Sequence, residues 1–379
     1  MRVGLIVPGF SADAEDWCIP ALRGLVQQLA TRVDAHVVAL RYPYRSSRYE
    51  LFGAQVTALG GGLRTSLASL GLWQRALALV ATEHRRRRFD VLHAFWGNET
   101  GALAALAGRL LGIPTLVSLA GGELVGFPDI RYGGQLAATE RVKVRLALGL
   151  ADIVTAGSCG LLERARRWLG SRPAERIQHV PLGVDLGRFY PDRSPSPDLP
   201  PCLVQVASLL RVKDQALLLR AAAHLRAAGR ACPVELVGEG PLEATLRALA
   251  DALDITSLVR FRGAIPHDRV PAVYRRATVY VQTSRHEAQG MAVLEAAACG
   301  LPVVGTPVGV LPELAPSCGA TVPPNDPGAL ATTISDLLAD SSRRIAMGRA
   351  ARVRVEADFN LVHSSERFLE LYTALEHRT

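Results

Sequence analysis

The sequence predicts an α/β protein that consists of two doubly wound domains. Three observations support this prediction. Short runs rich in β-branched residues alternate with longer segments rich in alanine and leucine, a pattern typical of βαβ units around a parallel sheet. A proline-rich stretch, YPDRSPSPDLPP at residues 190–201, interrupts this alternation near the middle of the chain. The chain of 379 residues is also long enough for two hydrophobic cores of ordinary size.

Seven runs in the first half of the chain predict strands, because they are short, apolar and bounded by glycine, proline or polar residues. They are RVGLIVPG (2–9), AHVVAL (35–40), VTALG (56–60), VLHAF (91–95), PTLVSLA (114–120), DIVTAG (152–157) and IQHVP (177–181). Helices are expected between several of them, for example over 19–31 and 100–112. These elements define an N-terminal domain over 1–189, followed by an interdomain linker over 190–201.

The same alternation resumes after the linker. Strands are expected in CLVQVAS (202–208), PVELVG (233–238), VRFRGAI (259–265), TVYVQT (278–283) and LPVVGT (301–306). Helices are expected over 214–229, 241–253 and 291–298. Together these elements predict a C-terminal domain over 202–358. Residues 359–379 predict a terminal amphipathic helix, which we expect to pack back toward the N-terminal domain.

The composition excludes several classes of protein. Apolar residues make up 49% and charged residues 21%, as in soluble globular proteins, and no apolar run is long enough to span a membrane. The start, MRVGLIVPGF, predicts a buried strand and not a secretory signal, so the expected compartment is the cytoplasm. The six cysteines stand singly, which argues against a disulfide framework or a zinc site. No G-x-G-x-x-G follows the first strand, so a nicotinamide-dependent dehydrogenase is not expected.

The net charge of +8 and the isoelectric point near 9.5 indicate anionic partners. The most basic run, Arg85 to Arg88, has two interpretations. Its arginines can be a solvated helix end that opposes the negative end of the helix dipole. They can also form a docking patch for an anionic membrane surface, which would make the protein peripheral at the inner face of the membrane. No nucleic-acid-binding motif accompanies the run, so nucleic acid is not an expected partner.

One stretch, TSRHEAQGMAVLEAAACGLPVV at residues 283–304, concentrates the chemistry. A strand, an exit loop and a helix are expected in that order, so Glu287 would lie at the carboxyl edge of a sheet. Gly290 allows close approach of the backbone, and the N–H groups from Met291 onward can bind an anion. Glu295, about one turn further along the helix, can accept two neighbouring hydroxyl groups. Two carboxylates on either side of a phosphate site match a nucleotide sugar, which carries a sugar on each side of its diphosphate. In the alternative interpretation, Glu287 caps the helix and Glu295 faces an arginine.

The spacing E-x7-E followed by EAAACGLPVVGTPVGVLPEL resembles glycosyltransferase family 4, a family of retaining enzymes. Similar stretches run through both halves, among them VPLGVDLGRFYP (180–191) and VASLLRVKDQALLLRAAAHL (206–225). The resemblance implies a GT-B fold, in which two Rossmann-like domains face each other across a cleft. It also implies metal-independent transfer of a hexose-type sugar from a nucleotide-diphosphate sugar to an acceptor hydroxyl, with no further cofactor. The acceptor would be a saccharide, a lipid-linked molecule or a small molecule in polysaccharide, glycolipid or glycoconjugate biosynthesis.

The resemblance assigns roles to three charged residues. Glu295 would bind the ribose hydroxyls, Glu287 would contact the donor sugar and act in catalysis, and Lys213 would hold the diphosphate. The chemistry agrees for Lys213, because the departing nucleoside diphosphate develops negative charge that an ammonium group stabilises. Taken without the surrounding motif, Lys213 would instead be an exposed lysine in a polar turn.

Other matches are weaker. Ser208 stands where the family commonly has an arginine, and Arg211 is the residue that could replace that arginine. Ile265 would bring its backbone near the nucleotide base, although Gly263 nearby is also explained by a plain turn after a strand. These positions complete the expected donor site.

On the acceptor side, the expected residues are Gly9, which allows close approach, and His93, at the end of a strand in VLHAFW. A structural role is the alternative for His93. The family often has a histidine where this chain has Ala120. Because Ser208 and Ala120 depart from the family pattern, a non-catalytic nucleotide-sugar-binding scaffold or regulator is the alternative function. An epimerase or hydrolase, which would need no acceptor, is a further enzymatic alternative.

Overall fold

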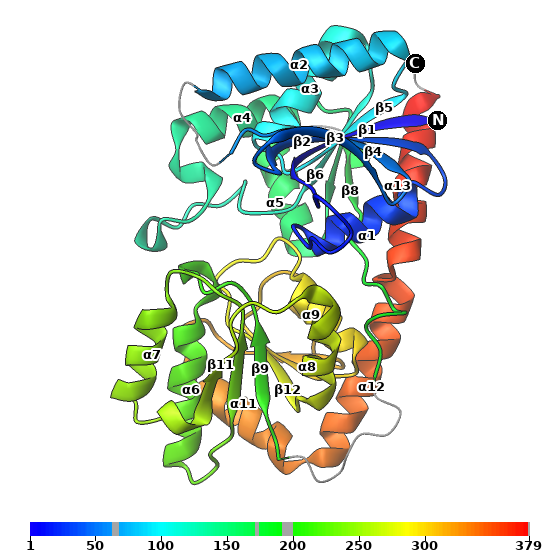
Figure 1. Ribbon diagram of the computed structural model, residues 1–379. Coiled ribbons are helices and arrows are strands. Elements are labelled where there is room, and N and C mark those ends of the chain that lie inside the picture. Colours follow the sequence, from blue (N-terminus) through cyan, green and yellow to red (C-terminus); the bar gives the residue numbers. More distant parts are fainter. Residues whose placement is uncertain (63–67, 171–173, 192–199, 378–379) are drawn as a thin grey trace. The chain divides into compact units, whose positions relative to one another are not determined.

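The computed structural model describes residues 1–62, 68–170, 174–191 and 200–377. The chain divides into two compact units (Figure 1). Residues Met1–Gly183 and Leu361–Thr379 make up the N-terminal unit, and residues Val184–Asn360 make up the C-terminal unit. Each unit has its own sheet, so the α/β architecture with two doubly wound units is confirmed.

The N-terminal unit is built on an eight-stranded sheet with the order β3-β4-β2-β1-β5-β6-β7-β8. All its neighbouring strands are parallel except β3, which runs antiparallel to β4. The strands are β1 (Arg2–Gly9), β2 (Asp34–Tyr42), β3 (Ser46–Leu51), β4 (Ala54–Leu59), β5 (Val91–Phe95), β6 (Thr115–Leu119), β7 (Ile153–Ala156) and β8 (Ile177–His179). The central strands are apolar over most of their length because helices cover both faces of a parallel sheet.

The α-helices of this unit are α1 (Pro20–Leu29), α2 (Ala68–Arg86), α3 (Glu99–Leu111), α4 (Ala138–Leu150), α5 (Cys159–Leu169) and α13 (Leu361–Glu376). Short 3-10 helices lie at η1 (Pro128–Ile130), η2 (Gly134–Leu136) and η3 (Ala174–Arg176). Helix α13 comes from the end of the chain and supplies Phe368, Leu371, Tyr372 and Leu375 to the same buried cluster as β1 and α1. The N-terminal unit therefore contains both ends of the chain.

The C-terminal unit has a six-stranded parallel sheet with the order β11-β10-β9-β12-β13-β14. The strands are β9 (Leu203–Val206), β10 (Val234–Val237), β11 (Val259–Phe261), β12 (Val279–Gln282), β13 (Val303–Gly305) and β14 (Gly319–Thr321). Counted from the first strand, this is the order 3-2-1-4-5-6 of dinucleotide-binding folds. The direction of winding therefore reverses between β9 and β12.

The α-helices of the C-terminal unit are α6 (Gln215–Ala227), α7 (Glu243–Ala252), α8 (Val270–Arg276), α9 (Met291–Ala298), α10 (Leu311–Leu314), α11 (Pro327–Ala339) and α12 (Ser341–Asp358). Its 3-10 helices are η4 (Arg211–Lys213), η5 (Thr256–Leu258) and η6 (His267–Arg269). Two buried clusters fill the unit, and one of them includes Tyr274, Tyr280 and the apolar residues of α9.

The boundary between the units differs from the expected one. The chain enters the C-terminal unit at Val184, ahead of the expected linker over 190–201, and leaves it at Asn360. Phe189 explains the difference, because its ring is buried in the core of the C-terminal unit. The proline-rich composition marks a break in secondary structure, but the packing of the residues before it decides the boundary. Residues 192–199 of the expected linker lie outside the described residues.

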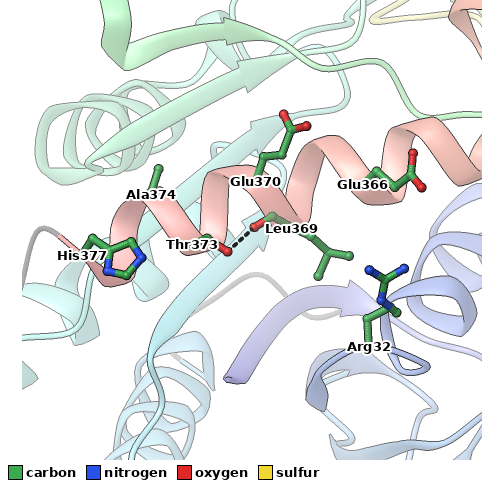
Figure 2. Close-up of a pocket in the computed structure, with 7 residues that line it drawn as sticks. All are labelled: Arg32, Glu366, Leu369, Glu370, Thr373, Ala374 and His377. Carbon is green, nitrogen blue, oxygen red and sulfur yellow. Dashed lines mark hydrogen bonds between the residues drawn. The ribbon is translucent and has the colours of Figure 1, made fainter.

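A hollow of about 620 Å³ lies beside α13 in the N-terminal unit (Figure 2). Its polar lining includes Arg32, Glu366, Glu370 and His377. Arg32 lies between α1 and β2, at the amino ends of the strands, whereas ligands of doubly wound sheets bind at the carboxyl ends. This hollow is therefore not the candidate site.

Among the described residues, no helix combines the length and the apolar character needed to span a bilayer.

Candidate functional site

The candidate site lies in the C-terminal unit, where β9 and β12 are neighbours. The loops that leave the carboxyl ends of these two strands turn in different directions, and such a switch point is where doubly wound sheets bind ligands. The loop after β9 leads into η4 and carries Lys213, and the loop after β12 carries Glu287. The sequence predicts Glu287 at this edge, and the family resemblance predicts that Lys213 holds the diphosphate.

Lys213 and Glu287 form a close ion pair. The Lys213 Nζ lies 2.6 Å from Glu287 Oε1, although the two residues are 74 positions apart. Ser284 Oγ donates a second hydrogen bond of 2.6 Å to the same carboxylate oxygen. The side chains of Lys213 and Glu287 remain 24% and 15% exposed, so a ligand can reach them. The structure therefore brings together the two residues predicted to be catalytic.

Buried polar groups hold the two loops together beneath this ion pair. Thr283 Oγ1 donates a hydrogen bond of 2.8 Å to the backbone oxygen of Lys213, and it accepts one of 3.0 Å from Gln205 Nε2. The backbone N–H of Arg285 donates to the backbone oxygen of Val212 at 2.8 Å. These hydrogen bonds link the backbones of the two loops, although Gln205 Oε1 is buried without a hydrogen-bond partner among the described residues. They hold the loop segments that carry Lys213 and Glu287 next to each other.

The loop after β13 supports Glu287 from another direction. Gly309 in this loop has a φ angle of 62°, and the backbone N–H of Val310 donates to the backbone oxygen of Gln289 at 2.8 Å. A Cβ atom on Gly309 would lie 2.3 Å from that oxygen and 2.9 Å from the Cβ of Glu287. Only glycine allows this close approach with a left-handed backbone.

We therefore expect Gly309→Ala to displace the Glu287 loop and to lower kcat by about tenfold or more, since small displacements of catalytic groups are costly. Steady-state transfer assays check this expectation. Gly71→Ala is the matched control, because a Cβ at Gly71 meets no atom within 4 Å. Equal kcat values for Gly309→Ala and the wild type would contradict the supporting role of this loop.

Helix α9 begins at the same edge of the sheet. Its N-cap is Gly290, with a φ angle of 93°, and within the described residues no side chain caps the helix. The interpretation in which Glu287 caps this helix is therefore wrong, since that carboxylate is bonded to Lys213 and Ser284. Met291, the first helical residue, is partly buried against the core. An uncapped helix start beside a lysine favours an anionic ligand.

Glu295 lies further along α9 and is bonded at both carboxylate oxygens. His267 Nε2 lies 2.8 Å from Oε1, and Tyr274 Oη donates to Oε2 at 3.2 Å. The interpretation in which Glu295 faces an arginine is therefore wrong. Burial, and then the nearby charge of Glu295, raise the pKa of Tyr274 far above its usual value, so this hydroxyl remains a donor. The Glu295 side chain is still 11% exposed.

The structure places the remaining expected donor residues around the same edge. Arg211 is exposed and begins η4, the short helix that ends at Lys213. Ile265 follows β11 and packs in part against the cluster that contains Tyr274. The turn before it is fixed by a hydrogen bond of 2.9 Å from the backbone N–H of Gly238 to the backbone oxygen of Gly263. The roles expected for Arg211 and Ile265 stay predictions.

In the N-terminal unit, Gly9 ends β1 at the carboxyl edge of the sheet. A Cβ atom on Gly9 would lie 3.0 Å from the Cβ of Tyr42 and 3.2 Å from the Sγ of Cys18. The backbone at Gly9 therefore lies close to these two side chains, which leave little room for a Cβ atom. A contact of Gly9 with an acceptor stays a prediction.

His93 does not face a ligand, which corrects the expected acceptor role. It lies within β5 and is 0% exposed. Its Nδ1 is 2.6 Å from Tyr372 Oη and its Nε2 is 2.8 Å from Ser118 Oγ, which in turn lies 2.6 Å from Thr155 Oγ1. The apolar neighbours of His93 in VLHAFW hide it in the core, where it ties α13 to the sheet.

Burial lowers the pKa of His93 to about 3, whereas a histidine in an unfolded chain titrates near 6.5. Below pH 6.5 the unfolded chain gains a proton that the folded chain does not bind. We therefore expect His93 to lower the free energy of unfolding by about 1.4 kcal/mol for each unit by which the pH is lowered from 6.5 toward 3.

Urea denaturation of the wild type and His93→Gln at pH 7 and pH 5 checks this expectation. All four tryptophans lie in the N-terminal unit, so their fluorescence reports on the unfolding of that unit. The stability advantage of the wild type over the variant should shrink by about 2 kcal/mol at the lower pH. An advantage that does not change with pH would contradict the neutral state of His93.

Comparisons with known proteins identify the family of the chain. Residues 19–183 match the family described as "Glycosyl transferase 4-like domain", and residues 188–354 match "Glycosyl transferases group 1". The chain is also 31% identical over 280 residues to the GDP-mannose-dependent alpha-(1-6)-phosphatidylinositol monomannoside mannosyltransferase of Mycolicibacterium smegmatis, which covers 69% of this chain and 71% of that protein. The chain belongs to glycosyltransferase family 4.

A second relative of this glycosyltransferase is the D-inositol 3-phosphate glycosyltransferase of Salinispora tropica, with 31% identity over 341 residues, 80% of this chain and 67% of that protein. Among solved structures, sucrose-phosphate synthase from Thermosynechococcus elongatus is similar over 100% of both chains, with a TM-score of 0.82 and 22% identity. HepE of Anabaena in complex with UDP-glucose is similar over 99% of this chain and 100% of its own, with a TM-score of 0.76 and 18% identity. These structures confirm the GT-B fold.

Glu123 was missed in the N-terminal unit of this glycosyltransferase, and it occupies the loop in which the family often has a histidine. Its Oε1 accepts hydrogen bonds from the backbone N–H groups of Gly97 at 3.1 Å and Ala120 at 3.0 Å. Its Oε2 accepts one from Gly121 at 2.8 Å. Glu123 thus joins the loops after β5 and β6. In the sequence, its position directly after two glycines is the feature that could have marked it as part of a loop close to the backbone.

Three supporting residues of the donor-side cluster were also missed: Ser284, His267 and Tyr274. The sequence places Ser284 in the same exit loop as Glu287, whereas no local pattern pairs His267 or Tyr274 with Glu295.

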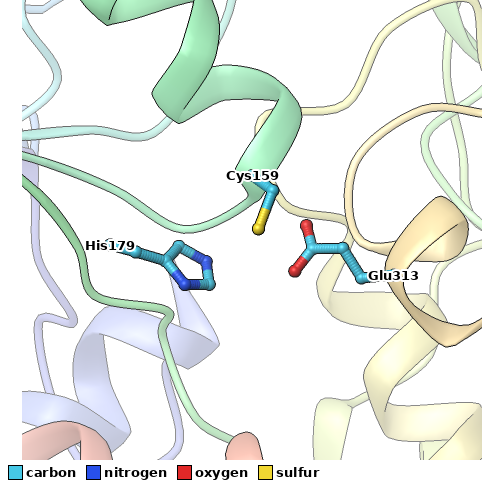
Figure 3. A group of neighbouring side chains, drawn as sticks. All are labelled: Cys159, His179 and Glu313. Atoms are coloured by element: carbon cyan, nitrogen blue, oxygen red, sulfur yellow. The ribbon is translucent and has the colours of Figure 1, made fainter.

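Figure 3 shows a further group, Cys159, His179 and Glu313. Cys159 and His179 belong to the N-terminal unit and Glu313 to the C-terminal unit, so we infer no metal site from them.

Proposed function

We propose that this glycosyltransferase retains the anomeric configuration, works without a metal ion, and transfers a hexose-type sugar from a nucleotide-diphosphate sugar to an acceptor hydroxyl. The observation that carries the proposal is the Lys213–Glu287 pair at the switch point of the C-terminal sheet. The lysine supplies positive charge and the start of α9 supplies N–H groups. Together these groups provide what a metal ion would otherwise provide to a departing diphosphate.

Each residue has one task in this scheme. Lys213 stabilises the charge that develops on the leaving diphosphate, which lowers the barrier more than it strengthens ground-state binding. Glu287 accepts hydrogen bonds from hydroxyls of the donor sugar and places the anomeric carbon. Glu295 accepts hydrogen bonds from the ribose. The acceptor oxygen then bonds to the anomeric carbon from the face that the diphosphate leaves, while the bond from that carbon to the diphosphate breaks. The acceptor proton passes to an oxygen of the leaving diphosphate, and the configuration is retained.

The donor and acceptor classes follow from the relatives. The mycobacterial relative is named for GDP-mannose and for a phosphatidylinositol mannoside, and HepE was solved with UDP-glucose. We therefore propose a GDP- or UDP-hexose as the donor. The acceptor is a saccharide, a lipid-linked saccharide or a small polyol, as in the synthesis of glycolipids or polysaccharides.

Transfer assays with a panel of GDP- and UDP-sugars test the proposal. We expect turnover in the presence of excess EDTA, and proton NMR of the first product should show the anomeric configuration of the donor. Loss of activity in EDTA that a divalent cation restores would overturn metal independence, and an inverted product would overturn retention. No binding of any donor would overturn the whole proposal.

Two observations favour a second candidate function, a nucleotide-sugar-binding scaffold without turnover. Ser208 and Ala120 stand where the family resemblance predicts an arginine and a histidine. Calorimetry separates the candidates when it is run beside the transfer assay. Donor binding with neither transfer to any acceptor nor hydrolysis would favour the scaffold, whereas donor hydrolysis without an acceptor would favour a hydrolase.

We also propose that the end of α2 binds anionic membrane surfaces. Arg85, Arg86, Arg87 and Arg88 are all exposed, and exposed arginines near a lipid surface each add attraction. The protein should float with vesicles that contain phosphatidylglycerol and should float less in high salt.

Arg85→Glu with Arg88→Glu should reduce this flotation several-fold. Arg349→Glu on α12 is the control for a change of net charge at another exposed position. Absence of flotation in low salt, or equal flotation of the double variant and the wild type, would overturn the proposal.

A further inference from the structure

The segment after β11 supplies both hydrogen-bond donors of Glu295. His267 lies in η6 and Tyr274 lies in α8, while Glu295 lies in α9. An ionised carboxylate can only accept, so His267 must donate from its Nε2, and the Tyr274 hydroxyl donates to the other oxygen. The two donors approach different oxygens and therefore restrict both the position and the rotation of the carboxylate.

The remaining hydrogen-bonding capacity of Glu295 matches a diol. A carboxylate has about four lone-pair positions, two on each oxygen. His267 and Tyr274 each use one position on a different oxygen, so about one position on each oxygen remains. The side chain as a whole is 11% exposed, so a ligand can reach this carboxylate. Two hydroxyl groups on adjacent carbons can fill the remaining positions together.

Aromatic packing holds the donors in place. The ring centroid of Phe189 lies 5.3 Å from that of His267 and 6.2 Å from that of Tyr274. Tyr274 and Phe189 are fully buried, whereas the His267 side chain is 17% exposed. His267 is therefore the member of this group that lies between the buried core and the ligand-facing edge.

We propose that His267 is a positioning residue that aims the Glu295 carboxylate at the two ribose hydroxyls of the nucleotide. The inference rests on the proposed function, because it assumes that a nucleoside diphosphate binds at this edge. It assigns the selection of ribose over deoxyribose to the pair His267–Glu295 and not to Glu295 alone. His267 does not need to touch the nucleotide itself.

Isothermal titration calorimetry with the full chain tests the proposal. The probes are GDP and UDP, each compared with its 2′-deoxy and 3′-deoxy forms. We expect the wild type to bind the ribose form of its preferred nucleotide about tenfold more tightly than either deoxy form, the effect of one hydrogen bond to a charged group. His267→Ala should lose about tenfold in affinity for the ribose form and should discriminate less than threefold against the deoxy forms.

Two further variants separate positioning from general stability. His267→Gln keeps an N–H donor at a similar place but removes the aromatic packing, and it should restore the preference for ribose to within threefold of the wild type. His224→Ala, at an exposed histidine of the same unit, is the control and should bind every probe like the wild type. A thermal unfolding scan confirms that each variant is folded.

The outcomes distinguish this inference from the proposed function. If the wild type binds a nucleoside diphosphate and folded His267→Ala keeps the full preference for ribose, the positioning role is wrong while the proposed function stands. If His267→Gln behaves like His267→Ala, the hydrogen bond is not what matters and the proposal is overturned. If the wild type binds neither GDP nor UDP, the proposed function and this inference both fail.

Discussion

Replacing Lys213 with alanine is expected to lower kcat by about three orders of magnitude, which corresponds to about 4 kcal/mol of transition-state stabilisation. The Nζ of Lys213 is the positive group that lies against Glu287 at the switch point, 2.6 Å from its Oε1. In the proposed mechanism, the substitution would remove the ammonium group from the leaving diphosphate and leave the backbone N–H groups at the start of α9. Steady-state transfer kinetics with a saturating donor measure the change.

The composition of the chain supplies an unusually direct control. Lys143 and Lys213 are the only lysines in the sequence, and arginine provides the other basic side chains. Lys143→Ala removes an ion pair with Glu140 in the N-terminal unit and should leave kcat near that of the wild type. Lys213→Arg should recover only part of the activity, because a planar guanidinium does not replace a compact ammonium.

Amine-specific labelling gives a second measurement of the same residue. Apart from the chain terminus, a reagent that acylates amines can modify only these two lysines. Bound nucleoside diphosphate should protect Lys213 and not Lys143. Near-normal turnover of folded Lys213→Ala, or labelling of Lys213 that saturating nucleotide does not slow, would contradict its contact with the diphosphate.

Replacing Glu287 with glutamine is expected to lower kcat by about two to three orders of magnitude. The substitution keeps the shape of the side chain but removes the negative charge that Lys213 and Ser284 both contact. The amide also places a donor where the carboxylate has an acceptor, so one contact with a sugar hydroxyl is lost or reversed. The value of kcat should fall more than the affinity for free nucleoside diphosphate.

Glu243→Gln is the matched control for Glu287→Gln. Glu243 lies on the surface of α7 in the same unit and pairs with Arg247 one turn along the helix. Its loss should change neither kcat nor nucleotide affinity, since such exposed pairs contribute little. A Glu287→Gln enzyme with the turnover of the Glu243→Gln control would remove Glu287 from the mechanism.

The parts of the site predictable from sequence are those fixed by local pattern and sheet direction. The apolar segment MAVLEAAA between Gly290 and Gly300 predicted α9 with its observed bounds, Met291–Ala298. Lys213 and Glu287 follow two strands of one parallel sheet, so their placement at the carboxyl edge needed no knowledge of the packing. That they form one ion pair depends on β9 and β12 being neighbours, which the strand order decides.

Other features depended on packing that the sequence does not show. Strand β3, SSRYEL, was not predicted because its residues are polar, and it pairs only at the edge of the sheet. His93 has apolar neighbours on both sides, but the Tyr372 hydroxyl that it meets lies 279 positions away. Tyr274 and Glu295 likewise come from separate helices. Contacts of this kind leave no local period in the sequence.

The assignment of α13 to the N-terminal unit has a consequence for how the protein folds during synthesis. Four buried side chains of that unit, Phe368, Leu371, Tyr372 and Leu375, leave the ribosome only after the whole C-terminal unit has done so. The C-terminal unit, by contrast, is complete once Asn360 has emerged, and its two ends are joined by a hydrogen bond of 2.8 Å from the Val184 N–H to the Phe359 oxygen. The core of the N-terminal unit therefore stays incomplete until the C-terminal unit has been synthesised, whereas domains usually fold in order from the N-terminus during synthesis. A premature stop near residue 360 would harm the half of the protein that was translated first.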